Sequence, residues 1–282
     1  MTEARLPEEV IRDIIILSLP RFRPKTFLKF DRNVNIDSHT QQQSTTAGTV
    51  WPVAILSVSK RWLRIGTPLF YKGVVLRKSS HTSAVARLVK VNPAVGRTIR
   101  YLRLESGSMT RELVTIAKHA PAIHTLYVEA CLREGHSYDG LQRAMCFLRP
   151  TTLYINNPLG GGYNYYDPSM TRTTNEMVLR TIVEAWTSVT ALHFSDHCIA
   201  TDSDKWTGAL QLPSLEELHI PAPPPYYAPQ GWFHWAQHLP HPPFKRLVLY
   251  ATRHRQLLKA ELKDIRKHIS YASTVDFVAG SN

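Results

Sequence analysis

The stretch IRYLRL at residues 99–104 decides the fold, because its pattern returns five times along the chain. The later copies are IHTLYV (123–128), PTTLYI (150–155), VTALHF (189–194), LEELHI (215–220) and FKRLVL (244–249). Every copy has leucine at its fourth position and an apolar residue at its sixth, which is the alternation of a β-strand with one buried face. Successive leucines are 24 to 39 residues apart, so we expect a repeating unit built around one short strand.

The segments between these strands have helical periodicity. In RELVTIAKHAPAI (111–123) the residues that share one helical face are Leu113, Ile116, Ala117 and Ala120. The segment NEMVLRTIVEAW (175–186) has the same spacing. Helix and strand, repeated six times, predict an α/β fold of the leucine-rich-repeat-like solenoid type. The copies are irregular, because only Cys131 lies where regular repeats place asparagine or cysteine.

A different pattern precedes the repeats. The segment LPEEVIRDIIILSLP (6–20) predicts a helix that has Pro7 in its first turn and ends at Pro20. Its apolar residues cover more than one face of this helix. We therefore expect the helix to be buried on more than one side.

The segment SVSKRWLRIGTPLFY (57–71) predicts a short basic helix that ends at Pro68. Spacings of three and four residues place one apolar stripe on a single helical face, made of Ile55, Val58, Trp62, Ile65 and Leu69. The basic residues Lys60, Arg61 and Arg64 fall on the opposite face. We expect the apolar stripe to be covered by another element or by a partner.

Between these two helices, residues 21–50 are polar and basic and end in a tract of glutamine, serine and threonine. This composition is typical of a disordered insertion. A long loop hinders the pairing of the two helices little, since each doubling of its length costs only about 0.6 kcal/mol. We expect two domains: a small helical module over residues 1–76, which contains the insertion, and the irregular repeats over residues 77–282.

The chain of 282 residues has 34 Lys plus Arg against 22 Asp plus Glu, a formal net charge of +12, which indicates an acidic partner or nucleic acid. The basic residues form no recognisable nucleic-acid module, so we expect a protein partner. The longest apolar stretch, VIRDIIILSL, is shorter than the roughly 20 residues that span a bilayer. The start MTEARLPEE lacks signal-peptide character, and three cysteines give no disulfide framework. We expect an intracellular protein, in the cytoplasm, the nucleus or both.

Catalytic and metal-binding motifs are incomplete. Ser57 and Lys60 have the spacing of an S-x-x-K nucleophile, but the motifs that accompany it do not follow. Two groups have metal-ligand chemistry without the spacing of a zinc site: His193, His197 and Cys198, and His234, His238 and His241. We expect no enzyme activity, cofactor or metal. A hydrolase that uses one of these histidine groups stays an alternative.

Two irregular segments are rich in aromatic residues: LGGGYNYYDPSMTRTT (159–174) and PAPPPYYAPQGWFHW (221–235). Aromatic side chains dominate binding hot spots, but they bury equally well in an irregular core. The candidates for contact with a target protein are Tyr163, Tyr165, Tyr166, Tyr226, Tyr227 and Trp232.

The two N-terminal segments together resemble the F-box, whose pattern is Leu-Pro-x-Glu, an apolar helix, then Val-x-Lys-x-Trp and a closing aromatic residue. The matching residues here are Leu6, Pro7, Glu9, Val10, Ile14, Leu56, Val58, Lys60, Trp62 and Leu69. Ser59 stands where the F-box often has cysteine, and the insertion separates the halves by more than usual. With its repeats, the chain is similar to the large F-box families of mushroom-forming fungi.

The resemblance implies a function. F-box proteins dock on a Skp-type adaptor and present bound substrates to a cullin-RING ubiquitin ligase, without doing chemistry themselves. It implies that the adaptor-binding residues are Leu6, Pro7, Val10, Ile14, Leu56, Val58, Trp62 and Leu69, with the basic face suited to an acidic adaptor. The alternative is a scaffold or recognition protein outside the ubiquitin system, whose N-terminal helices only cap the solenoid.

Overall fold

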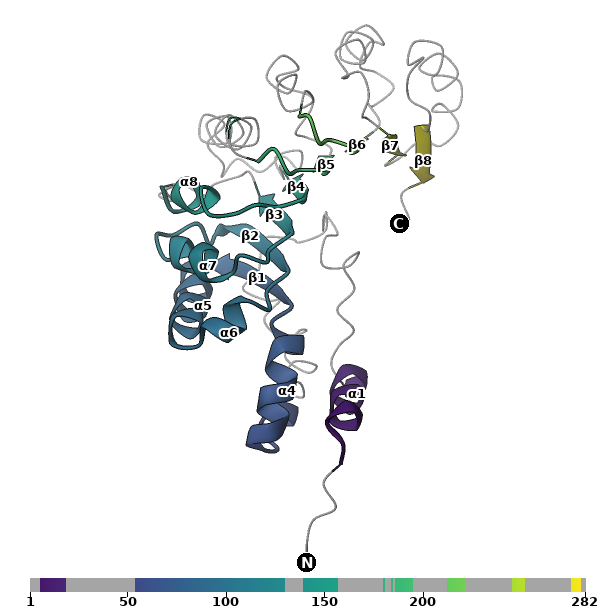
Figure 1. The fold of residues 1–282 in the computed structure, drawn as a ribbon. Helices are drawn as coiled ribbons and strands as arrows, with labels where there is room; N and C mark the ends of the chain where they lie inside the picture. The colour runs from purple at the N-terminus through teal and green to yellow at the C-terminus, as the bar shows by residue number, and fades with distance from the viewer. Residues whose placement is uncertain are drawn as a thin grey trace, which may run out of the picture.

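The computed structural model describes residues 6–18, 54–129, 139–156, 180, 184, 186–194, 212–221, 245–251 and 275–279. Within them the chain is an α/β protein whose eight strands form one parallel sheet, in which neighbours in the sequence are neighbours in space (Figure 1). The strands are β1 (Gly73–Lys78), β2 (Tyr101–Gly107), β3 (Thr125–Glu129), β4 (Thr152–Asn156), β5 (Ala191–Phe194), β6 (Glu217–Pro221), β7 (Arg246–Ala251) and β8 (Val275–Ala279). The sheet therefore grows by one strand at a time, in chain order.

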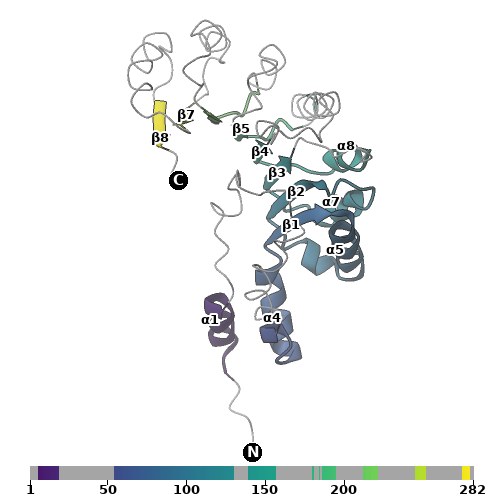
Figure 2. The same ribbon diagram turned by 180° about the vertical axis from the view of Figure 1, so that it is seen from behind.

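Helices lie on one face of the first half of the sheet. They are α5 (Ser79–Val91), α7 (Leu113–His119) and α8 (Asp139–Met145), with the short α6 (Pro93–Gly96) leading towards β2. The strands follow a curve, and these helices stand side by side on its outer side (Figures 1 and 2). The helical face predicted for residues 111–123 is confirmed, because its four apolar residues are all buried. No helix in the described ranges is long and apolar enough to cross a bilayer.

The six predicted leucines stand in register across the sheet. The strand pairings that align them are Leu102–Leu126, Leu126–Leu153, Leu153–Leu192, Leu192–Leu218 and Leu218–Leu247. All six side chains are completely buried. Full burial of a leucine contributes about 1.5 to 3 kcal/mol, so this row forms the centre of the core. The strands expected from the repeated pattern are confirmed.

One hydrogen-bond arrangement repeats where the strands begin. The carbonyl of Lys72, just before β1, accepts the N–H groups of Arg100 and Tyr101 at 2.9 and 3.1 Å. The same double acceptance recurs at the carbonyls of Arg100, His124, Thr151, Thr190 and Glu216, each towards the two residues that open the next strand. Because each strand starts level with its predecessor, the leucines of successive units meet.

Two strands extend the sheet beyond the six predicted segments. The repeated pattern does not include β1, whose Val74 and Leu76 pair with Leu102 and Leu104 of β2. The domain boundary expected between residues 76 and 77 consequently falls inside β1. The strand β8 lies beyond the last predicted segment, and its residues VDFVA pair with β7 along the whole length of β8.

Candidate docking surface

The N-terminal helices α1 (Glu8–Ser18) and α4 (Lys60–Phe70) lie side by side at the β1 end of the sheet (Figures 1 and 2). On α1 the residues buried in this pair are Ile11 and Ile15, four positions apart on one helical face. On the other side Leu56 is only 8% exposed, and Gly66 of α4 is buried. A small apolar core therefore holds the two helices together.

Gly66 lets the two helices approach closely. A Cβ atom at this position would collide with Cδ2 of Leu56 and would lie 3.3 Å from Cδ1 of Ile15. The glycine therefore leaves room for the side chains that α1 and the residues before α4 place against it. Leu56, which the resemblance implies to face an adaptor, lies against Gly66 and is buried in this structure.

Much of the apolar surface of the pair stays exposed. Leu17 on α1 is 76% exposed and Val58 before α4 is 62% exposed. The further large apolar residues that are exposed here are Leu6, Val10, Ile16 and Leu63. Helical spacing puts Val10, Ile14 and Leu17 on a face of α1 beside the buried one. So α1 is apolar on two sides, and in the described structure only one of them is covered.

The predicted adaptor-binding residues divide by exposure. Four are exposed, namely Leu6, Pro7, Val10 and Val58, and three are half-buried, namely Ile14, Trp62 and Leu69. The prediction omitted Ile16, Leu17 and Leu63, which are exposed too. A signal for Ile16 and Leu17 was present, since the apolar residues of that helix exceed a single stripe.

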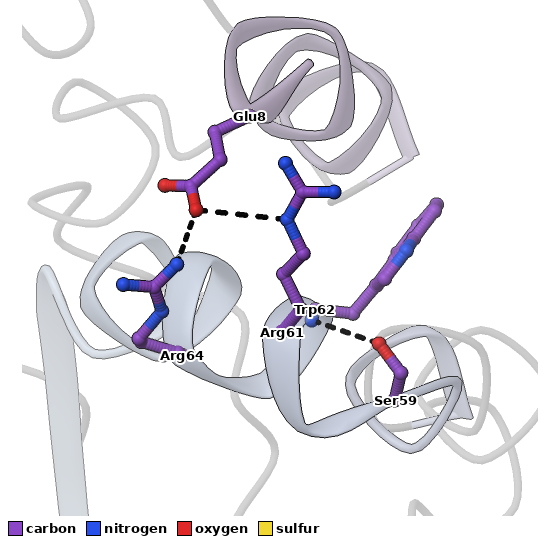
Figure 3. Close-up of polar contacts among 5 residues, drawn as sticks. All are labelled: Glu8, Ser59, Arg61, Trp62 and Arg64. Atoms are coloured by element: carbon purple, nitrogen blue, oxygen red, sulfur yellow. Dashed lines mark hydrogen bonds and ion pairs between the residues drawn. The ribbon is translucent and has the colours of Figure 1, made fainter. Parts of the chain in front are cut away.

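The start of α4 divides the apolar stripe predicted there. Ser59 is the N-cap residue, with extended φ and ψ of −161° and 165°, and its hydroxyl oxygen accepts the Trp62 N–H at 3.3 Å (Figure 3). Because α4 begins after this cap, Ile55 and Val58 precede the helix. The expectation of one helical face with five apolar residues is therefore wrong.

The predicted end of this helix at Pro68 is also wrong. Pro68 lies inside α4, which continues to Phe70, and the Tyr71 N–H donates to the Thr67 carbonyl at 3.0 Å. A proline in the last turn removes a single backbone donor. The Thr67 hydroxyl in addition donates to the Leu63 carbonyl at 2.6 Å.

A charged contact also joins the helices. The Glu8 carboxylate, in the first turn of α1, forms ion pairs with Arg61, at 3.6 Å from Nε, and with Arg64 (Figure 3). All three side chains are partly exposed, so each pair contributes at most about 1 kcal/mol. Two of the three basic residues expected to face an acidic adaptor are thus already paired within the chain, and Lys60 is exposed.

The inner face of the sheet, opposite the helices, carries a row of stacked side chains. In successive strands the Arg103 guanidinium lies 4.3 Å from the ring centre of Tyr127. Further along, the His193 ring stacks between Tyr154 and His219, at centroid distances of 3.9 and 3.8 Å. Burial lowers the pKa of both histidines; the neighbouring His219 lowers the pKa of His193 further. His193 is therefore part of a structural stack on the sheet.

Several predicted candidates lie outside the described residues. They include all six aromatic candidates, Tyr163, Tyr165, Tyr166, Tyr226, Tyr227 and Trp232, as well as the insertion at 21–50. Of the two histidine groups only His193 is described. In the described part of the chain, no three His, Cys, Asp or Glu side chains are grouped as metal ligands.

Comparison with known proteins assigns no family to this arrangement. No protein-family model matches the chain, and no curated protein matches it either. What the helix pair does has to follow from its own residues.

Replacing Gly66 by alanine should loosen the helix pair. Alanine favours the helix by about 1 kcal/mol, but the added methyl group collides with Leu56, and overpacking costs about 1 to 3 kcal/mol. We expect faster amide hydrogen exchange in α1 of Gly66→Ala than in the wild type. Lys60→Ala, at an exposed position of the same helix, should leave α1 unchanged. Slower exchange in α1 of Gly66→Ala would show that helix propensity outweighs the collision.

The stacked histidines should make the sheet sensitive to acid. His193 is faced by Tyr154 and His219, and His219 by Glu217 and Arg246. Because the pKa values of both histidines are lowered in the folded chain, the unfolded chain binds more protons below about pH 6.5. The folded chain holds both histidines neutral, so its free energy of unfolding is unaffected by their titration above about pH 6.5 and decreases as the pH falls below that value.

Urea unfolding at about pH 7.5 and about pH 5.5 measures this effect. We expect His193→Phe, which keeps a ring in the stack, to lose less stability between the two pH values than the wild type. An equal loss in both proteins would contradict the assignment of the acid sensitivity to this stack.

Proposed function

We propose that this chain is an F-box protein that serves as the substrate-recognition subunit of a Skp-cullin-F-box type ubiquitin ligase. The helix pair α1 and α4 docks on a Skp-type adaptor, and through it on a cullin. The sheet with its outer helices is a leucine-rich-repeat-like solenoid that binds a target protein. The chain itself does no chemistry, because its task is to hold a substrate near the ligase.

The observation that carries this proposal is the exposed apolar surface of the helix pair. Among the described residues eight large hydrophobic side chains are exposed, and six of them belong to α1, α4 or the residues beside them. Contiguous exposed apolar surface on a soluble domain marks an interaction site. Helices with such a face are bound in the groove of a partner.

The energetic scale fits such docking. Each large apolar side chain that becomes fully buried contributes about 1.5 to 3 kcal/mol, while association costs an estimated 4 to 15 kcal/mol in lost freedom. Leu6, Val10, Leu17 and Val58 are 40 to 76% exposed, so covering all four recovers about half of this value for each and reaches the lower part of the cost. Docking that covers only one or two of them would be weak.

The arrangement of the body supports the solenoid proposal. Each strand pairs with the strand of the next unit, and the described helices of the body stand on the outer side of the curve (Figure 1). Stacked units of this kind leave an extended inner surface for recognition. The row of Arg103, Tyr127, Tyr154, His193 and His219 lies on this inner surface.

One observation favours the alternative of a scaffold whose N-terminal helices only cap the sheet. Tyr71, directly after α4, packs against the core of the sheet, so the helix pair is joined closely to the body. A cap, however, buries its apolar face against the repeats, whereas Val10 and Leu17 are exposed. The adaptor proposal accounts for both observations.

Charges placed on the exposed apolar face should abolish adaptor binding. Val10→Asp combined with Leu17→Asp puts two carboxylates where a groove would have to desolvate them. We expect loss of co-precipitation with a Skp-type adaptor, while the thermal midpoint stays close to that of the wild type because both positions are exposed.

The matched control is Arg12→Asp, which adds a carboxylate at an exposed position of the same helix away from the apolar face. This variant should still co-precipitate. Undiminished binding by the Val10/Leu17 variant, or absence of binding by the wild type, would refute adaptor docking by this surface.

A further inference from the structure

A second surface lies where strands β1 to β4 begin, and we call it the strand-start edge. It comprises the helix ends and turns that precede these strands, at residues 71–72, 90–100, 118–124 and 146–151. The backbone hydrogen bonds from Arg100 N to Lys72 O (2.9 Å) and from His124 N to Arg100 O (3.1 Å) join three consecutive strand starts. Since neighbouring strands are about 4.8 Å apart, Lys72, Arg100 and His124 lie close together. Burial and the charges of Arg100 and Lys72 lower the pKa of His124, so the positive charge of this row comes from Lys72 and Arg100.

Further cations surround this row. Lys90 and Lys118 are exposed in the last turns of α5 and α7, and Arg97 and Arg149 are exposed in the turns before β2 and β4. A lysine in the last turn of a helix is explained by the helix dipole. Arg97 is the C-cap residue of α6, and Nη1 of Arg149 donates to the carbonyls of Cys146 and Leu148 at 3.0 and 2.8 Å. Both cations thus lie beside helix ends as well, and both are exposed.

Carboxylates are absent from the described segments of this edge, because none of them contains Asp or Glu. The carboxylates of the same units lie at the other edge, where the strands end and the helices begin. They are Glu105 and Glu129 at the ends of β2 and β3, Glu112 before α7 and Asp139 at the start of α8. Arg77, Lys78 and Arg111 lie at that other edge together with these carboxylates, whereas the cations of the strand-start edge have no carboxylate in the described segments beside them.

Exposed apolar side chains accompany these cations. Outside the helix pair, the large hydrophobic residues exposed in the described structure are Val91, at 85%, and Phe147, at 45%. Both lie at this edge, directly after Lys90 and two residues before Arg149. The ammonium group of Lys118 lies 4.8 Å from the ring centre of Phe147, so charge and apolar surface are in contact.

We infer that the strand-start edge binds an acidic polypeptide segment that carries apolar side chains between its carboxylates. Its carboxylates would pair with Lys72, Arg97 and Arg149, and its apolar residues would cover Val91 and Phe147. This inference does not depend on adaptor docking, since it uses residues outside the helix pair.

The alternative occupant, nucleic acid, fits this edge less well. Single-stranded nucleic acid is held by bases stacked on open aromatic faces. At this edge the rings of Tyr101 and His124 pack edge to face at 4.7 Å, and the Lys118 ammonium covers one face of Phe147. Val91 presents an aliphatic side chain, which gives a phosphate backbone nothing to contact. A polypeptide with both carboxylates and apolar residues matches the exposed cations and the exposed large apolar side chains of the edge.

The test uses the full chain and a fluorescent peptide of about twelve residues that repeats Glu-Glu-Leu, followed by anisotropy at low salt. Exposed ion pairs contribute up to about 1 kcal/mol each, so Arg97→Glu with Arg149→Glu should weaken binding about tenfold or more. The control, Arg87→Glu with Arg111→Glu, makes the same charge change at exposed positions within α5 and before α7, away from this edge. It should weaken binding less than about threefold.

The apolar part is tested separately. Val91→Ser with Phe147→Ser keeps every charge and should weaken binding of the Glu-Glu-Leu peptide but not of a Glu-Glu-Ser peptide. Equal weakening by the two arginine pairs would mean attraction by net charge alone and would overturn the inference. It would also be overturned if no peptide bound, or if an oligothymidine of similar length bound more tightly than the peptide through Arg97 and Arg149.

Discussion

The structure depends on one backbone contact that recurs at each strand start from β2 to β7, where a single carbonyl accepts the N–H groups of two residues in the next unit. This contact sets the level at which each strand begins. With the level fixed, Leu102 and its counterparts meet in the core. The same register stacks Tyr154, His193 and His219 on the inner face. It also lines up the basic residues of the strand-start edge. Core, inner face and edge are therefore three consequences of one repeated hydrogen-bond geometry.

The helix pair depends on a different constraint. Some apolar residues of α1 are buried against α4, and others are exposed. Ile15 and Leu56 both lie against Gly66, and together with the buried Ile11 they hold α1 on α4. Val10 and Leu17 lie on another side of the same helix and are exposed. A helix with two apolar sides and one neighbour needs a second neighbour, and in our proposal the adaptor fills that place. The exposed apolar surface at the strand-start edge differs in kind, because it is small and is surrounded by cations.

The sequence predicted the repeating body better than the helix pair. Leucine at the fourth position of each strand segment is a local signal with period two, and it predicted six strands and their buried positions. The buried face of α7 followed from helical spacing, which is a local signal as well. Which side of α1 is buried depends on tertiary contact with α4 and Leu56, and local spacing in the sequence does not reveal that contact. Ser59 shows the same limit: its capping bond to Trp62 N splits a stripe that has correct helical spacing. The stack at His193 was equally hidden, since strand spacing alone does not show which rings meet.

The central claim is that a foreign protein covers the apolar surface of α1 and α4. Titration calorimetry of the full chain with a Skp-type adaptor at several temperatures tests it most directly, because burial of apolar surface gives a negative heat-capacity change of binding. The account predicts a clearly negative change that becomes smaller when Leu17 and Val58 are replaced by serine. Binding with a heat-capacity change near zero, or no binding at all, would contradict it.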